Sequence, residues 1–126
     1  MDIPPGPFIE HLGLRFGHLS GDRVEATWTA RPEFHQPYGI VHGGVHASVV
    51  ESLASMGAVM WYADRGRCVG VSNRTDFFRA VSDGVLTSVG TPIHQDDIQQ
   101  VWLVETHDAE GRLVASGQLR VQNLPG

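Results

Sequence analysis

The chain has 126 residues, of which 41% are hydrophobic and 18% charged, and its formal net charge at pH 7 is -5. This length and composition predict one globular domain over residues 1–126. The acidic balance argues against a nucleic-acid partner, which would require a basic face. No apolar segment is long enough for a membrane span, and the N-terminus lacks the pattern of a signal peptide. The single cysteine, Cys68, permits no internal disulfide and fits a reduced, cytoplasmic setting.

The first half of the chain predicts a short helix, two strands, a loop and one long helix. The proline-rich first seven residues are expected to be extended, and Gly13 is expected to end the short helix. A turn at Ser20-Gly21-Asp22 separates the two strands, the second of which alternates apolar and polar residues. The elements are expected at residues 7–14 (helix), 15–30 (two strands), 31–42 (loop) and 43–63 (long helix).

The second half has the shorter periodicity of strands. Turn signals at Ser82 to Gly84 and at Ala109 to Gly111 predict hairpins between successive strands. Successive hairpins make an antiparallel sheet, and the long helix must bury its apolar side against that sheet, so the predicted class is α+β. One helix covers only one face, so we expect part of the remaining surface to contact another subunit. The strands are expected near residues 68–80, 85–94, 98–108 and 112–123.

The long helix has two different faces. On a helical wheel, one arc of roughly 80° holds the apolar residues expected to face the sheet, namely Val45, Val49, Leu53, Met56 and Met60. Glu51 lies on the opposite side, where a surface residue in water is the ordinary interpretation. However, Glu51 is the only charged residue from Gly43 to Tyr62, and alanines flank it. Such a face also suits close approach of another chain or a ligand.

The helix begins at a His42-Gly43-Gly44 turn. A helix N-terminus presents unpaired N–H groups and the positive end of the helix dipole, and glycine lets a ligand approach the backbone closely. Together these features suit an anion or an oxyanion that develops in a transition state. A turn that only requires glycine conformations is the alternative.

The stretch QPYGIVHGGVHASVVESLAS, residues 36–55, resembles the helix entry of hotdog-fold acyl-CoA thioesterases. It is most similar to the PaaI-like branch that uses a glutamate and acts on aryl or aroyl thioesters. The shared pattern is a Gln, a His-Gly six residues later, a Glu nine residues after the His, and a Ser or Thr four after that. This resemblance implies a hotdog fold, in which a curled antiparallel sheet of five to six strands wraps one long helix.

The resemblance also implies roles at the matching positions. Glu51 would attack the thioester carbonyl or activate the attacking water, and the Gly43 N–H would polarise the thioester oxygen. Gln36 would hold the reacting groups, and His42 would orient the turn. Ser55 would lie near the Glu of a neighbouring subunit and position water. The site would form at a dimer interface, commonly within a tetramer, and coenzyme A would enter as part of the substrate with no other cofactor.

Softer similarities extend the expected site to substrate-binding residues. Phe77 and Phe78 would line the pocket, and Arg79 would contact a phosphate of coenzyme A; sheet core and surface are equally good interpretations of these residues. Gly44 and His94 complete the candidates. The sequence departs from the family at Gln95-Asp96-Asp97, where many relatives have Gly-Arg.

Other chemistries have less support. His42 and His46 are four residues apart, but no third ligand is evident, so no metal site is expected. The Gly-x-Ser-x-Gly signature of serine hydrolases is absent, and Cys68 lies in an apolar strand pattern. Two functions remain: a thioesterase for a small aromatic or short- to medium-chain acyl-CoA, and a non-catalytic binding protein for acyl thioesters or small ligands on the same fold.

Overall fold

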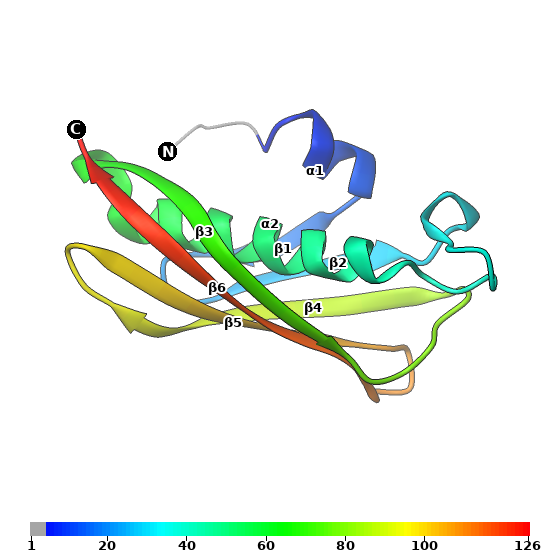
Figure 1. The fold of residues 1–126 in the computed structure, drawn as a ribbon. Coiled ribbons are helices and arrows are strands. Elements are labelled where there is room, and N and C mark those ends of the chain that lie inside the picture. Colours follow the sequence, from blue (N-terminus) through cyan, green and yellow to red (C-terminus); the bar gives the residue numbers. More distant parts are fainter. Residues whose placement is uncertain (1–4) are drawn as a thin grey trace.

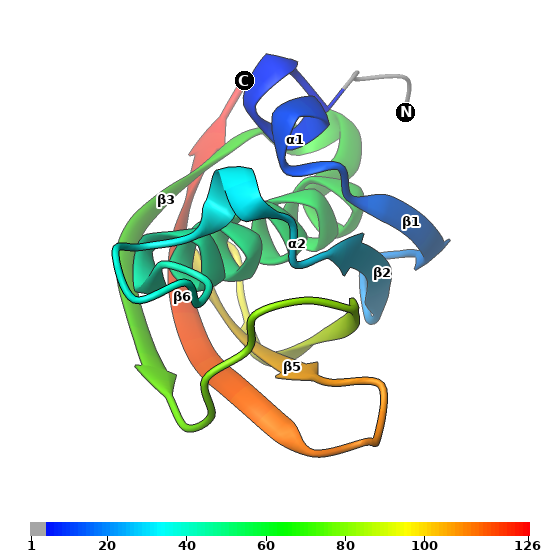
Figure 2. The ribbon, with the colours of Figure 1, turned by 90° about the vertical axis from the view of Figure 1, so that its right-hand side faces the viewer.

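In the structure, a computed structural model, one long helix lies in the hollow of a curved sheet of six antiparallel strands (Figures 1 and 2). This is the hotdog arrangement, which confirms the expected α+β class. The structure describes residues 5–126, so the first part of the segment expected to be extended lies outside it. No helix within this range is long and apolar enough to cross a membrane. The elements are α1 (Pro7–Leu12), β1 (Arg15–Leu19), β2 (Val24–Thr29), η1 (Pro32–Phe34), α2 (Gly43–Tyr62), η2 (Ala63–Arg65), β3 (Gly66–Phe77), β4 (Val85–Gln95), β5 (Gln99–His107) and β6 (Leu113–Pro125).

The strand order is β1-β2-β4-β5-β6-β3, which differs from a run of hairpins. The turn at residues 109–111 joins β5 and β6 as predicted. The hairpin predicted at Ser82–Gly84 is wrong, because β3 pairs with β6 and β4 pairs with β2 and β5. Residues 78–84 cross from the edge of the sheet to its centre (Figure 2). Turn residues permit the chain to reverse, but they do not select the strand with which the next segment pairs.

This crossing segment holds the loop that precedes α2. The Val81 carbonyl accepts a hydrogen bond from the Val41 N–H at 2.8 Å, and the Ser82 carbonyl lies 2.6 Å from Nε2 of His35. Next to them, the Ala30 N–H donates to the Gly84 carbonyl at 2.9 Å. The start of α2 is therefore positioned by a connection that lies some forty residues later in the sequence.

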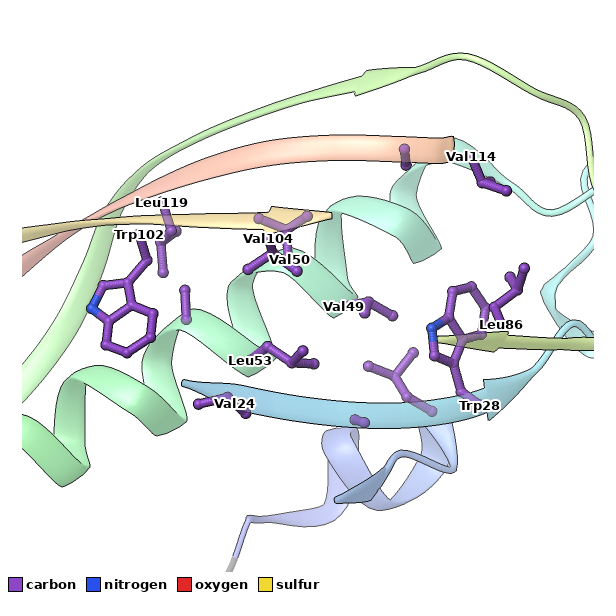
Figure 3. Packing of buried hydrophobic residues seen from close by; sticks show 14 of the residues in the cluster. Val24, Trp28, Val49, Val50, Leu53, Leu86, Trp102, Val104, Val114 and Leu119 are labelled. Atoms are coloured by element: carbon purple, nitrogen blue, oxygen red, sulfur yellow. The ribbon is translucent and has the colours of Figure 1, made fainter. Parts of the chain in front are cut away.

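The core fills the space between α2 and the concave face of the sheet (Figure 3). Val49 and Leu53 are fully buried, as the helical wheel predicted. Val45 is half-buried and packs against the core, as predicted, whereas Met56 and Met60 are half-buried outside this cluster, so the predicted stripe is wrong at these two positions. The sheet curls around the helix and covers a broader face than a flat sheet would, and the buried row extends to Val50, Ala54, Gly57 and Ala58.

The indole of Trp102 on β5 lies against the backbone of α2 at Gly57. A Cβ at Gly57 would lie 2.3 Å from Cη2 of Trp102, so only glycine fits. The indole Nε1–H donates to Oε1 of Gln100 at 2.9 Å. Gln100 in turn donates to Oδ1 of Asn123 at 3.0 Å and to the Ala58 carbonyl at 3.2 Å. This buried network satisfies the polar groups and fixes the ring against the helix.

Candidate functional site

His42 closes the N-terminus of α2. The ring Nδ1 of His42 accepts a hydrogen bond from the Gly44 N–H at 2.8 Å, and the backbone N–H of His42 donates to the Phe34 carbonyl at 2.8 Å. Because Nδ1 is the acceptor, the neutral ring carries its proton on Nε2. The Gly44 N–H is thus occupied, whereas the Gly43 N–H makes no hydrogen bond with any residue from 5 to 126. The free donor at the positive end of the helix is therefore the one at Gly43.

Five of the predicted site residues surround one cavity of about 340 Å³, called here the helix-start cavity. They come from the loop before α2, from its first turn and from the end of β3. Gly44 does not line this cavity, although it was a substrate-binding candidate. The lining residues are Gln36, Ile40, Val41, Gly43, His46, Phe77, Phe78, Arg79 and Ala80.

The Phe77 ring lies directly over the backbone of Gly43. A Cβ at Gly43 would come within 2.6 Å of Cε2 of Phe77, closer than side chains approach one another. A side chain at position 43 would therefore have to displace the Phe77 ring, whereas glycine lets the ring lie over the backbone. Phe77 is 55% exposed in the single chain, so a large part of this ring is available to a ligand or a partner.

Gln36 holds the turn that leads to His42. Its N–H donates to the Ile40 carbonyl at 2.8 Å, and its carbonyl accepts from the Gly39 N–H at 3.0 Å. The side-chain Oε1 accepts from the Tyr38 N–H. Within the described residues the side-chain NH₂ group has no partner, which leaves two donors beside the cavity.

Glu51 and Ser55 line a second cavity of about 320 Å³, called here the carboxylate cavity, together with Phe8, Ile9, Ser48 and Ser52. The Glu51 carboxylate is exposed and has no hydrogen bond or ion pair to the part of the chain that the structure describes. Ser48 and Ser52 use their hydroxyls on helix carbonyls four residues earlier, at 2.7 Å each. Ser55 does not, so its hydroxyl remains beside Glu51 of the same chain.

The two cavities are separate within one chain. Glu51 follows Gly43 by eight residues, which is about 12 Å along a helix at 1.5 Å per residue. A glutamate side chain cannot span that distance and reach a carbonyl bound at the Gly43 N–H. In one chain the two halves of the predicted site, the Gly43 N–H and the Glu51 carboxylate, are therefore too far apart to act on the same carbonyl.

His94 and the Gln95-Asp96-Asp97 segment lie at the other end of the sheet, at the β4–β5 turn (Figure 1), and line neither cavity. Oδ1 of Asp96 accepts hydrogen bonds from the N–H groups of Ile98 and Gln99, each at 2.8 Å. His94 bonds to the other oxygen of Asp96 at 2.7 Å. The bond from His94, with the two N–H groups, lowers the pKa of Asp96 to about 2. The residues that depart from the family pattern, Gln95-Asp96-Asp97, therefore belong to the β4–β5 turn. The structure does not bring His94 to the predicted site.

His46 is a residue of this site that the sequence pattern suggested only as a metal-ligand partner of His42. It is 3% exposed and lines the helix-start cavity. Its ring packs edge-on against Trp28, with centroids 5.7 Å apart, and lies 5.9 Å from the Phe77 ring. Burial lowers its pKa to about 4, so the ring is neutral at physiological pH. The sequence signal that indicates a buried position for His46 is its spacing, since it precedes the buried Val49 and Val50 by three and four residues.

Comparisons with known proteins agree with this geometry. The family model of the thioesterase superfamily matches residues 38–115. The crystal structure of S. sahachiroi AziG superposes with a TM-score of 0.96 at 54% identity, covering 98% of this chain and 100% of that one. The proofreading thioesterase EntH of Cronobacter turicensis is 36% identical, over 90% of this chain and 83% of its own. The 1,4-dihydroxy-2-naphthoyl-CoA hydrolase of Escherichia coli K12 is 31% identical, over 90% and 84%. The chain therefore belongs to the thioesterase superfamily and is a hotdog-fold thioester hydrolase.

Proposed function

We propose that this protein hydrolyses a small acyl-CoA, with an aromatic or short- to medium-chain acyl group, to the free acid and coenzyme A. The observation that carries the proposal is the free Gly43 N–H at the start of α2 together with an unpaired carboxylate at Glu51 on the same helix. The first is an electrophilic donor, and the second is a nucleophile or general base. Thioester hydrolysis requires both.

In the proposed reaction, the thioester oxygen accepts a hydrogen bond from the Gly43 N–H, where the negative charge develops. Loss of one such donor typically costs about 10²–10³ in kcat. Glu51 either attacks the carbonyl and forms an anhydride that water opens, or removes a proton from the attacking water. Both routes expel the coenzyme A thiolate. The side-chain donors of Gln36 and the hydroxyl of Ser55 hold the carbonyl or the water.

A second copy of the chain would bring the two halves together. The sheet has two free edges, β1 and β3, and β3 is the longer strand; it pairs only with β6 and exposes Val69 and Val71 by nearly half. A long exposed edge strand of this kind is a template for pairing with another chain. Oε2 of Glu51 lies over Gly70 of β3, and Phe77 of the same strand covers Gly43. Both halves therefore lie beside the edge at which a partner would dock.

The positions along β3 and α2 predict where the two-fold axis would pass. Ala47 is midway between Gly43 and Glu51 on α2. It accepts a hydrogen bond from Nδ2 of Asn73 on β3 at 2.9 Å, and Asn73 is close to midway between residues 70 and 77. An axis near the Ala47–Asn73 contact would set Glu51 of each chain opposite the partner's Gly43. Two identical sites would result, each with residues from both chains.

The substrate class rests on the cavity and on the relatives. Phe77 and Phe78 give the helix-start cavity an aromatic rim, which suits a flat acyl group. The E. coli relative is named for an aromatic acyl-CoA. Arg79 lines the same cavity and is proposed to bind a phosphate of coenzyme A. Membership of the glutamate-using branch, assembly into tetramers and a cytoplasmic location are part of this proposal.

The direct test is release of free thiol from benzoyl-, hydroxybenzoyl-, phenylacetyl-, hexanoyl- and palmitoyl-CoA. We expect turnover of the smaller thioesters that collapses in Glu51→Ala, while ligand binding persists. Unchanged hydrolysis in this variant would remove Glu51 from the mechanism. Binding without turnover in the wild type would favour a non-catalytic acyl-thioester binding protein.

The two-chain site is tested by complementation. Glu51→Ala and Gly43→Ala chains, each first measured alone for residual activity and checked for folding, are mixed and refolded together. Random pairing makes half of the dimers mixed, each with one intact site, so about a quarter of wild-type activity should return. No recovery from dimers that are shown to have mixed would contradict a site shared between chains.

A further inference from the structure

His46 is a polar side chain in a place that packing alone does not explain. Its ring makes no hydrogen bond with any residue between Pro5 and Gly126, and Nδ1 is buried without a partner. Buried polar groups nearly always have a partner, and one left without it is destabilising. A leucine or phenylalanine would fill the space between Trp28 and Phe77 without this cost. The other ring nitrogen, Nε2, is not enclosed and also has no partner among these residues, so a partner that arrives from the cavity would bond there.

The position of His46 selects the part of the substrate that it could contact. It lies one helical turn beyond Gly43, on the wall of the same helix-start cavity. A thioester carbonyl held by the Gly43 N–H would direct its acyl arm past the Phe77 ring toward His46. Because the ring is neutral, it offers one donor and one acceptor and no charge. It therefore suits a neutral polar substituent rather than a carboxylate or an ammonium group.

We propose that His46 is a specificity-determining residue that forms a hydrogen bond with a hydroxyl group on an aromatic acyl group. This inference rests on the proposed thioesterase function and deepens it. A hydroxyl is both donor and acceptor, so it pairs with Nε2 in either tautomer of the imidazole. The flat ring that bears the hydroxyl would pack against Phe77 and beside His46, both of which line the helix-start cavity. An acyl group without the hydroxyl would leave the imidazole unpaired, and the site would discriminate against it.

The test compares matched substrates. The values of kcat/KM are measured for benzoyl-CoA and its 2-, 3- and 4-hydroxy isomers, and for 2-naphthoyl-CoA and 1-hydroxy-2-naphthoyl-CoA. We expect the wild type to prefer a hydroxylated member by roughly 10- to 100-fold, the range of one buried hydrogen bond. His46→Leu should bring the ratio of kcat/KM between hydroxylated and unsubstituted thioesters close to one, and His46→Gln should retain part of the preference. His107→Leu, on β5 and outside the cavity, is the matched control.

A second measurement does not depend on turnover. The ring nitrogens of ¹⁵N-labelled histidine are observed by NMR while 2-, 3- or 4-hydroxybenzoate, 1-hydroxy-2-naphthoate or unsubstituted benzoate is added. We expect a hydroxylated acid to shift the His46 signals, and benzoate to leave them nearly unchanged.

The outcomes separate the two proposals. Equal hydroxyl preference in the wild type and His46→Leu, with Glu51→Ala inactive, would overturn the role of His46 and leave the thioesterase function intact. The role of His46 is likewise overturned if no hydroxylated acid shifts its signals, since a bound water would then be the partner. Full turnover in Glu51→Ala would instead overturn the proposed mechanism, whatever His46 does.

Discussion

Replacing Gly57 with alanine tests the packing of the central helix against the sheet. The new Cβ would lie 2.3 Å from Cη2 of Trp102, where an ordinary contact is at least 3.4 Å, so the two groups must separate by about 1.1 Å (3.4 minus 2.3). Trp102 has no exposed surface, and its Nε1–H is held by Gln100. Overpacking of a well-filled core costs about 1–3 kcal/mol, and alanine regains about 1 kcal/mol of helix propensity over glycine. With three ring atoms within 2.8 Å, we expect the upper end of this range and a net loss of about 2 kcal/mol.

The assay is urea and thermal unfolding at one fixed protein concentration, because dissociation of an oligomer would otherwise enter the result. The expected decrease in Tm is roughly 6–8 °C for a chain of this size. Gly17→Ala on β1 is the control, since the nearest atom to its Cβ is the Glu25 carbonyl oxygen at 4.0 Å. This control should change the free energy of unfolding by less than about 0.5 kcal/mol.

A double-mutant cycle distinguishes a collision with the ring from a general effect of alanine. The atoms that collide are Cη2, Cζ3 and Cζ2, the outer atoms of the indole. In a Trp102→Phe background these atoms are absent, so Gly57→Ala should be close to neutral there. The coupling free energy between the two positions should be about 2 kcal/mol. An equal loss in both backgrounds, or no loss in the wild type, would refute the packing argument.

Three further predictions concern the site and the β4–β5 turn. Because burial lowers the pKa of His46 from 6.5 to about 4, the unfolded chain binds a proton that the folded chain does not. The free energy of unfolding should therefore rise between pH 4 and pH 6.5, and it should rise more steeply than in His46→Leu by up to about 1.4 kcal/mol per pH unit. Urea unfolding that gives the same pH dependence for both proteins would contradict this. Gly43→Ala keeps the backbone N–H, but its Cβ should displace the Phe77 ring and lower kcat/KM about 10-fold, as read by thiol release with near-wild-type far-UV circular dichroism. Full activity would argue against a substrate that packs between Gly43 and Phe77. Asp96→Ala should lower the urea midpoint of unfolding, whereas Asp96→Asn, which keeps the acceptor for two N–H groups, should lower it less; equal midpoints in the two variants would contradict this.

Much of the fold follows from local patterns that the sequence displays. The long helix ends within one residue of its predicted limit, at Tyr62 rather than Ala63, because its apolar spacing and its flanking breakers are local properties. The period-two pattern of residues 24–30 reflects a strand with one buried face, and β2 has that burial pattern. The helix entry from Gln36 to Ser55 gave a prediction of the site from spacing alone, and the structure places Gln36 and Gly43 on one cavity and Glu51 and Ser55 on another.

The tertiary structure decided which strands pair and which residues surround the site. The Ser82–Gly84 turn signal is satisfied equally by a hairpin and by a crossing, and only the long pairing of β3 with β6 selects the crossing. His94 was assigned to the substrate side by analogy, and the structure places it at the β4–β5 turn with a hydrogen bond to Asp96. His46 stood out only when Trp28 and Phe77, from strands far apart in sequence, closed around it. Periodicity along one chain records which side of an element is apolar, whereas the identity of the neighbours depends on contacts between distant segments, which no local pattern encodes.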